Sequence, residues 1–554
     1  MGARWASGAL RARAPRLELA GSPTGGQFGG ERSLVWASAL LAAGASGLYL
    51  LLGPPGPDLA AQVYRAGLAA AHGIPIWDGQ WYGGHYLLGY SLLAPLAEAA
   101  IGAQLLGVGA TMISAAAFAE LAHRHFGARA RVGALWFSLA LTTDVIVGRV
   151  AFSLGLALAL VALVALHGKH PRLGAGVAVL CSLASPVAGV LLALVTFAVW
   201  VAHRRPGPLV ASLCALAPVA AMAWLFPQGG RQPFTVASCM EAVAFALVAV
   251  ALLPRRERVV RVGALLYAVS CALAFAVPTP LGSNVLRLGM LFEGPLLACV
   301  LWVRSRRLAV VAGALLLVWQ WFPAISAISG AAGDPSTRPE YFRPLLAYLN
   351  SHAGTVGRIE IPSTRNHWEA AYVAPRFPLA RGWERQLDVR YDPLFYGGRL
   401  SAAGYHSWLR RSAVRYVAVP DAPLDPSAKA EVALIDSRPP YLRLVHRDAH
   451  WRVFAVSRPL PLVTGAGRLL GFGPSSFALA ATRLGSTTVR VHYTPFWRVV
   501  AGSGCVEATG AGWTRVVAPA GGQVKVAIRF SAEQLVAPAR ASCSPGAAVR
   551  GPTG

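Results

Sequence analysis

Apolar segments, several of them short or broken, follow one another along residues 33–325, and every second loop between them is rich in arginine. A helix needs roughly 20 mainly apolar residues to cross the hydrocarbon core of a membrane. The first segment covers residues 33–52 and the eleventh covers residues 308–325. The sequence therefore predicts an α-helical polytopic membrane domain with about 11 transmembrane helices.

Composition supports this prediction and also divides the chain. Hydrophobic residues make up 55% of the sequence and charged residues only 13%, whereas about a quarter of the residues are charged in typical soluble domains. The apolar residues are concentrated before Ile328, and the remainder has the mixed composition of a soluble domain. We expect a cytoplasmic basic tail (1–32), a membrane domain (33–329) with an outer loop (53–104), and two exterior subdomains (330–458 and 459–554).

The basic residues predict the orientation. Residues 1–329 contain 23 Lys and Arg, and 19 of them fall in the tail and in every second loop. Cytoplasmic loops carry such an excess, so we expect a multi-pass protein of the plasma (inner) membrane with a cytoplasmic N-terminus and an extracytoplasmic C-terminal region. Residues 33–52 would be an uncleaved signal anchor, although Ala43-Gly44-Ala45 also suits a cleavage site. Because the formal net charge of +26 is divided between both parts of the chain, nucleic acid is not expected as a partner.

The exterior region changes character near Pro459. Before it, a predicted helix (339–351) is followed by short alternating runs, which favour an α/β subdomain; after it, the pattern is purely β with Gly/Pro turns, which favours a β-sandwich. Cys505 and Cys543 would form a disulfide in an oxidising compartment, and the sequence leaves their pairing open. Walker, GxGxxG and CxxC motifs are absent from the sequence, so no nucleotide or metal cofactor is predicted from motifs.

The outer loop carries two acids that are candidates for catalysis. Asp58 follows the stiff turn Gly53-Pro54-Pro55-Gly56-Pro57, which would hold its carboxylate just outside the bilayer; there it could accept a proton from an attacking hydroxyl, or it could only cap the helix expected at 59–71. Asp78 is the second candidate, and a local turn is its alternative role. A second helix, lying on the membrane surface, is expected at 86–100.

Charged residues in or beside membrane spans are costly, and therefore candidates for function. Arg149 and Arg287 would bind the phosphate of a lipid head group, and Asp144 would contribute to the same substrate site. The alternative is structural pairing of Arg149 with Asp144 and of Arg287 with Glu293, although the second pair is poorly spaced for one helix. In the outer loop, the aromatic and polar side chains that could contact a sugar, or only anchor the loop at the interface, are Trp77, Trp81, Tyr82 and His85.

This arrangement resembles the C-type (GT-C) glycosyltransferases, membrane enzymes that use polyprenyl-phosphate sugars. The similar features are the acid after the first span (Asp58), the long outer loop (59–100), the many short spans and the exterior C-terminal region. Residues 77–95 and 280–287 are also similar to bacterial membrane proteins labelled 6-pyruvoyl-tetrahydropterin-synthase-related. The resemblance implies a GT-C-like fold in which Asp58 is the base and an arginine holds the lipid phosphate.

The same resemblance implies the partners of such an enzyme: membrane lipid, a polyprenyl-phosphate-linked sugar as donor, and a glycan or lipid as acceptor in the bacterial cell envelope. It implies no organic cofactor. Many GT-C enzymes carry an acidic pair after the first span, whereas Leu59 and Ala60 follow Asp58 here, which leaves the need for a divalent metal open. Two other hypotheses remain: a transporter or flippase of a lipid-linked glycan, and a non-catalytic scaffold of the cell envelope.

Overall fold

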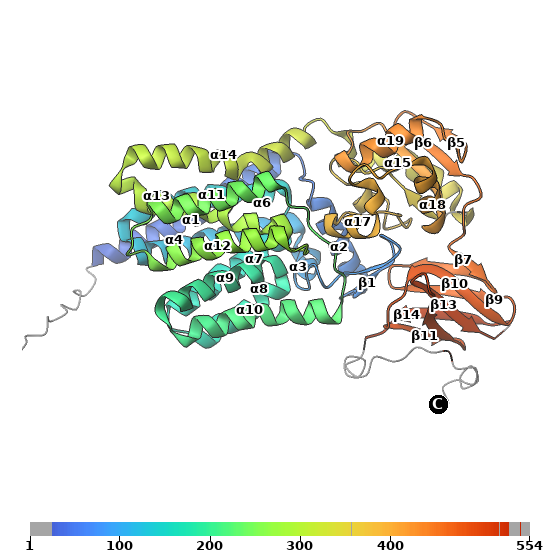
Figure 1. Cartoon of the computed structure of the whole chain (residues 1–554), viewed down its shortest axis with the longest axis horizontal. Helices are drawn as coiled ribbons and strands as arrows, with labels where there is room; N and C mark the ends of the chain where they lie inside the picture. The colour runs from blue at the N-terminus through green and yellow to red at the C-terminus, as the bar shows by residue number, and fades with distance from the viewer. Residues whose placement is uncertain (1–24, 356, 520, 531–542, 544–554) are drawn as a thin grey trace, which may run out of the picture.

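The computed structural model describes residues 25–355, 357–519, 521–530 and 543. The helical part and the β-rich part lie at opposite ends of the long axis of the molecule (Figure 1). The helices of the first part are α1 (Gly25–Leu52), α4 (Ala103–Phe126), α5 (Ala130–Ala140), α6 (Thr142–Val147), α7 (Val150–His167), α8 (Pro171–Ala184), α9 (Pro186–His203), α10 (Pro206–Leu225), α11 (Val236–Leu252), α12 (Arg258–Ala276), α13 (Leu286–Arg304) and α14 (Arg306–Ala331).

Eight helical segments among the described residues are long and apolar enough to cross a membrane, and α8 and α11 are shorter apolar helices. One of the eight, Ala103–Val147, has 45 residues and would be roughly 68 Å long if straight. The segment is not straight but turns back at Gly127. The Phe118 ring in α4 and the Phe137 ring in α5 stack at 4.2 Å, which shows that the two helices lie side by side. The expectation of a multi-pass helical membrane protein is thereby confirmed.

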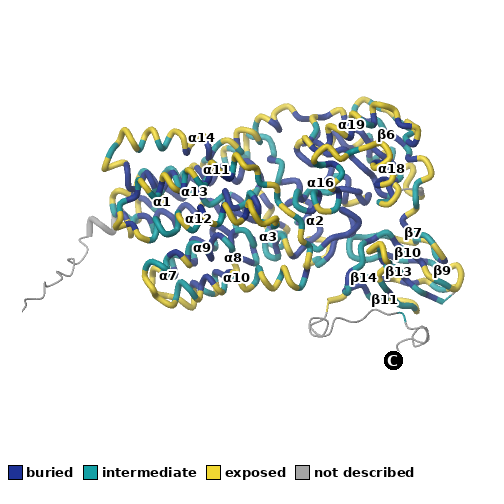
Figure 2. Tube along the Cα trace, in the orientation of Figure 1, coloured by how far each residue is buried: buried dark blue, intermediate teal, exposed yellow. Residues whose placement is uncertain are grey.

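The membrane helices expose large apolar side chains and bury small ones. Val318 of α14 is 70% exposed and Trp224 of α10 is 73% exposed, and the outer surface of α14 is largely exposed in Figure 2. Inside, a Cβ atom at Gly133 of α5 would lie only 2.3 Å from the Cys299 sulfur of α13. Close approach at small residues is how helices pack inside lipid, where burying hydrocarbon supplies little driving force.

Between α1 and α4, the outer loop forms α2 (Leu59–His72), the two-stranded ladder of β1 (Trp77–Asp78) and β2 (His85–Tyr86), and α3 (Ala94–Ile101). The prediction of a helix from residue 86 is wrong at its start. The backbone N–H of Ala94 donates to the Ser91 hydroxyl at 3.0 Å, and Pro95 occupies the first turn of α3. Both features are typical of a helix beginning here.

The C-terminal region forms two units, which we call the exterior units after the location that the sequence predicts for them. The first contains a four-stranded sheet with the order β3-β4-β6-β5. β3 and β4 are parallel, and the other neighbours are antiparallel. Its strands are β3 (Arg358–Glu360), β4 (Val414–Pro420), β5 (Leu442–Arg447) and β6 (Trp451–Val456), and its helices are α15 (Pro339–Ser351), α16 (Glu369–Tyr372), α17 (Arg385–Tyr391), α18 (Ala402–Arg411) and α19 (Lys429–Asp436).

The last unit is a sandwich of two four-stranded antiparallel sheets, with orders β12-β13-β10-β7 and β11-β14-β9-β8. Val489 and Val516 from one sheet and Phe477 and Val526 from the other belong to one buried cluster, as expected where two sheets pack face to face. The strands are β7 (Val463–Gly465), β8 (Gly467–Gly473), β9 (Ser476–Ala481), β10 (Gly485–His492), β11 (Trp497–Ala501), β12 (Cys505–Ala508), β13 (Trp513–Ala518) and β14 (Gln523–Ile528).

A disulfide joins Cys505 to Cys543, which answers the question that the sequence left open. Disulfides persist in oxidising compartments. The bond is therefore consistent with an extracytoplasmic C-terminal region.

Candidate functional site

Asp58 lies where the proline-rich turn after α1 meets the end of α6. A Cβ at Gly56 would lie 2.1 Å from the Ile146 carbonyl oxygen, so the turn can approach α6 only with glycine at this position. The Asp58 N–H donates to the Val147 carbonyl at 3.0 Å. The Asp58 carboxylate makes no capping hydrogen bond to α2, so the cap-only alternative is wrong. Its side chain is about 30% exposed.

Two arginines and a second acid gather around this carboxylate. Arg149 places Nε 3.6 Å from Asp58 Oδ2 and Nη1 3.3 Å from Asp144 Oδ1. The predicted structural pairing of Arg149 with Asp144 is therefore present, and Asp58 is a second carboxylate paired with the same guanidinium. Gly148, which has the left-handed φ of 90°, ends α6 and places Arg149 at the start of α7. Any side chain at Gly148 would collide with Leu59.

Arg287, at the start of α13, lines a small cavity with Asp144 and Arg149. Its Nη2 donates to Asn284 Oδ1 at 2.7 Å, and its guanidinium lies 4.7 Å from the centre of the Phe152 ring. Its expected alternative partner, Glu293, makes no ion pair with it in the part of the chain that is described. Asp58, Asp144, Arg149 and Arg287 thus form one cluster, which we call the outer charge cluster.

A cavity of about 690 Å³ extends from Arg287 into the helical part. Its walls are almost entirely apolar and come from α4, α7, α9, α11, α12 and α13. Basic and histidine side chains lie at the end remote from Arg287: His125, His167, Lys169, His203 and Arg205. The outer charge cluster therefore stands at one end of a space shaped for hydrocarbon.

The aromatic residues of the outer loop are packed inside protein. Trp81 is fully buried, 4.4 Å from the Tyr64 ring and parallel to the His85 ring at 5.7 Å. Trp77 belongs to the core of the β-sandwich, and the Tyr82 hydroxyl accepts the Glu384 N–H. Burial lowers the pKa of His85 to about 3, so this ring is neutral at physiological pH. The rings of these side chains anchor the loop to the exterior units, while both ring nitrogens of His85 and the indole N–H of Trp81 are buried and meet no hydrogen-bond partner in the described part of the chain. Their contact with a sugar stays a prediction.

Asp78 is also buried, and it accepts hydrogen bonds from Tyr64 Oη at 3.0 Å and from the Gln80 N–H at 2.9 Å. The second bond is the local turn that the sequence offered as its alternative role. Burial raises the pKa of Asp78 to about 7, although both hydrogen bonds act to lower it. None of its hydrogen bonds connects it to the outer charge cluster.

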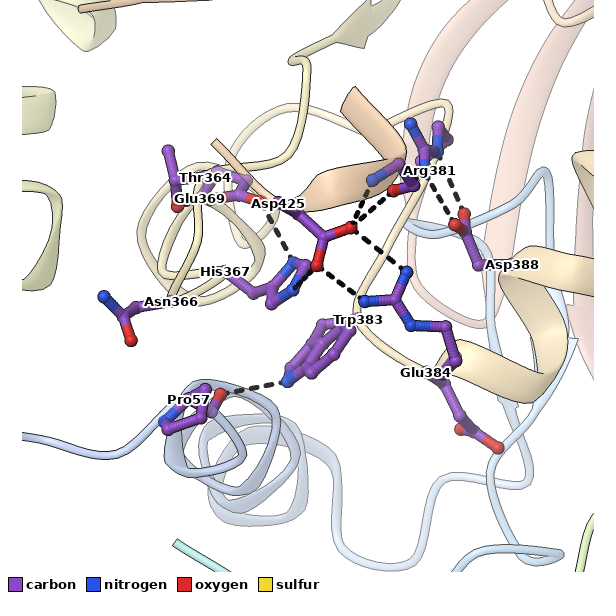
Figure 3. A network of polar contacts seen from close by, with 12 residues as sticks. Pro57, Thr364, Asn366, His367, Glu369, Arg381, Trp383, Glu384, Asp388 and Asp425 are labelled. Carbon is purple, nitrogen blue, oxygen red and sulfur yellow. Dashed lines mark hydrogen bonds and ion pairs between the residues drawn. The ribbon is translucent and has the colours of Figure 1, made fainter. Parts of the chain in front are cut away.

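The sequence analysis did not identify the polar contacts that join α2 to the exterior unit. Arg65 Nη2 lies 2.5 Å from Glu384 Oε2, with both side chains buried, and its guanidinium lies 3.8 Å from the centre of the Tyr90 ring. Trp383 Nε1 donates to the Pro57 carbonyl at 2.9 Å, directly before Asp58 (Figure 3). The sequence signals were the cost of an arginine on the outer side of the membrane and the polar, aromatic composition of residues 380–388.

Behind Trp383, His367 stacks on the indole at 3.4 Å and lies between Asp425 and Glu369 (Figure 3). Burial acts to lower the pKa of His367, but the two neighbouring carboxylates outweigh it and raise the pKa. Arg385 adds a paired contact to Asp425. In the sequence, residues 367–369 and 380–388 are dense in polar and aromatic residues, which is typical either of a solvated loop or of a surface that faces the membrane active site. The solvated loop is wrong, because most of these side chains are buried, in a network that supports the turn carrying Asp58.

Among the described residues, no group of three or more His, Cys, Asp or Glu side chains is placed to hold a metal ion. No protein-family model and no curated protein matches this chain.

Proposed function

We propose that this protein is a membrane glycosyltransferase of the GT-C kind, which moves a sugar from a polyprenyl-phosphate donor to an extracytoplasmic glycan or lipid acceptor. One observation carries the proposal: a partly exposed carboxylate, Asp58, lies beside Arg149 within a cluster that stands at the outer end of an apolar cavity. An anionic lipid needs this combination, because its hydrocarbon requires an apolar space and its phosphate requires guanidinium groups.

In the proposed reaction, the acceptor hydroxyl attacks the anomeric carbon of the sugar. Asp58 takes the hydroxyl proton as the new C–O bond forms. The bond from the anomeric carbon to the phosphate oxygen breaks, and the lipid phosphate leaves with that electron pair. Arg149 and Arg287 stabilise the negative charge that develops on the leaving phosphate.

The proposed topology has eleven crossings. The eight long apolar segments become nine when Ala103–Val147 is counted as the pair α4 and α5–α6, and the shorter α8 and α11 bring the number to eleven. With the N-terminus in the cytoplasm, the outer charge cluster and the disulfide-bonded C-terminal region then lie on the extracytoplasmic side of the inner membrane.

The experiment is an assay of the purified full chain in lipid vesicles with radiolabelled polyprenyl-phosphate sugars. Asp58→Asn keeps the shape but cannot accept the proton, so transfer should fall by ~10²–10⁴-fold while donor binding persists. Arg287→Lys loses the planar fork and should weaken donor binding first. Asp436→Asn is the matched control, because this aspartate lies on the surface of α19 and is about half exposed. Full transfer by Asp58→Asn would show that the base lies elsewhere.

A flippase is the second candidate, and the shape of the cavity favours it. The cavity connects Arg287 with the basic residues at the remote end of the helical part, as a lipid-translocation path would. The same vesicles separate the two functions: a flippase moves the labelled lipid between leaflets without forming a new glycosidic bond. A scaffold would do neither.

A further inference from the structure

The apolar cavity has a second charged end, which the proposed reaction does not use. Phe152, beside Arg287, and His167 both belong to α7, and both line the cavity. These two residues of α7 are 15 positions apart in the sequence, so the cavity follows this helix for about 22 Å. The remote end is therefore a separate place from the outer charge cluster.

Five basic or histidine side chains surround this remote end. We call them the basic mouth, and its members are His125, His167, Lys169, His203 and Arg205. All five residues are exposed, so a ligand can reach them. Within the described residues, His125 is the only one of the five whose side chain makes a hydrogen bond or an ion pair, to Glu257 at 2.8 Å. Lys169 and Arg205 thus offer two accessible cations without a partner in that part of the chain.

These two cations come from different loops that pack together. Lys169 lies between α7 and α8, and Arg205 lies between α9 and α10. A Cβ at Gly207 would lie 3.2 Å from the Cβ of Pro171, so the chain is in contact with itself two residues beyond each cation. Basic residues are common on the cytoplasmic side of membrane proteins, but these two meet at the opening of an apolar space.

The combination of cations and apolar walls narrows the chemistry of the ligand. A phosphate pairs with an ammonium and a guanidinium group, whereas a cationic head would be repelled by Lys169 and Arg205. One leaflet of the hydrocarbon core is about 15 Å deep, which is less than the 22 Å along α7, so an acyl chain that starts at the mouth ends before Arg287. Glu293 also lines the cavity, but it lies toward the outer end, about 9 Å along α13 from Arg287.

We propose that the basic mouth binds the phosphate of an anionic phospholipid from the leaflet remote from the outer charge cluster, with an acyl chain inside the cavity. Lys169 and Arg205 hold the phosphate, and the apolar walls enclose the chain. The volume of about 690 Å³ is in the range of sites that enclose small molecules. The inference goes beyond glycosyl transfer, because this lipid is not a reactant.

The test uses two photoreactive phospholipids with identical acyl chains that carry the reactive group, one with an anionic phosphatidylglycerol head and one with a phosphatidylcholine head that is neutral overall. The full chain is placed in phosphatidylcholine nanodiscs with the probe below saturation. After illumination, mass spectrometry measures the labelling of peptides from α7, α9 and α12. The anionic probe should label them about 25-fold more, because each Lys or Arg beside an anionic lipid contributes about fivefold.

The double variant Lys169→Gln with Arg205→Gln should bring this ratio close to one, while the neutral probe still labels it and shows that the cavity persists. The charge-keeping double variant Lys169→Arg with Arg205→Lys should retain the preference for the anionic probe. Equal labelling of the unmodified chain by both probes would overturn the proposal, and so would an unchanged ratio in the first double variant.

Arg306→Gln with Arg307→Gln is the matched control. These two arginines are exposed at the start of α14, lie on the same side in the predicted topology, and are not among the residues that line the cavity. Their removal takes away the same charge and should keep the full ratio. If it lowers the ratio as far as the loss of Lys169 and Arg205 does, surface charge alone attracts the lipid and the proposal fails. All of these outcomes are independent of whether the chain transfers a sugar.

Discussion

The ion pair between Arg65 and Glu384 should be a main contributor to the attachment of α2 to the exterior unit. The two side chains are only 2% and 8% exposed, so solvent screens their interaction little. Removing one partner of such a pair leaves a buried charge uncompensated and costs about 3–5 kcal/mol. Arg65→Met and Glu384→Gln should therefore each weaken the interface by about this amount.

The assay is hydrogen–deuterium exchange of the full chain, followed in peptides of α2 and α17. A loss of about 3 kcal/mol in local opening free energy accelerates exchange by about two orders of magnitude. Arg343→Ala is the control, because Arg343 forms an ion pair with Glu340 on α15 that is mostly exposed, and such pairs contribute little. If both interface variants exchange within a few-fold of the unmodified chain, the interface does not depend on this pair.

The same exchange experiment at several pH values tests whether the defect of Arg65→Met is electrostatic, because a loss of packing alone would not depend on pH in this way. Burial already raises the pKa of Glu384, and Arg65 acts to lower it. Without Arg65, the carboxyl should be protonated at mildly acidic pH, so the defect of Arg65→Met should shrink as the pH falls. The defect of Glu384→Gln, in which no carboxyl remains at this position, should lack this rescue, and the double variant should be less perturbed than the sum of the single variants.

Three further predictions follow from other parts of the molecule. Alkylating Cys505 and Cys543 after reduction should destabilise the β-sandwich by about 2–4 kcal/mol in chemical unfolding, because their bond closes a loop between positions 38 residues apart; free labelling of both thiols without reduction would contradict the bond. The folded state keeps the Asp78 proton up to pH of about 7, whereas the unfolded chain releases it near pH 4. The free energy of unfolding should therefore decrease as the pH rises from about 4 to about 7, and Asp78→Asn should reduce this decrease. An identical pH dependence in the variant would refute the assignment. A reporter fused after Ile328 should be active only outside the cytoplasm and one fused at Arg256 only inside; reversed activities would overturn the orientation.

The membrane part could be predicted from the sequence because lipid imposes local rules. A crossing segment must be long, apolar and helical, and each of these properties is visible in about 20 neighbouring residues. The start of α3 was harder to predict. The residues before Ala94 are apolar enough to continue a helix, but the Ser91 hydroxyl bonds the Ala94 N–H and the Ala184 carbonyl, and the second contact comes from a distant segment.

The members of the outer charge cluster could be identified one by one, because each is a costly charge near the end of an apolar segment. Their assembly could not be predicted. It depends on Gly56 and Gly148, because a Cβ atom at either position would lie less than 2.5 Å from backbone atoms of the facing segment. Only glycine therefore lets the turn before α2 approach the junction of α6 and α7. In the sequence alone, these glycines are indistinguishable from ordinary loop glycines.

The aromatic loop shows the limit of interpreting residue types without partners. Trp and Tyr beside membrane spans are enriched at the lipid interface, in sugar sites and in protein interfaces alike, since all three pair an apolar ring surface with a polar edge. Contacts with the first exterior unit decide among these roles here. Gly382 packs on the Trp81 ring so closely that a Cβ would lie 2.5 Å from the ring. Glu384, more than 300 residues after Arg65, pairs with the Arg65 guanidinium. The outer loop is thus the core of the junction between the two halves. A substitution in its buried rings should therefore act on Asp58 through the position of the loop and not through direct contact with substrate.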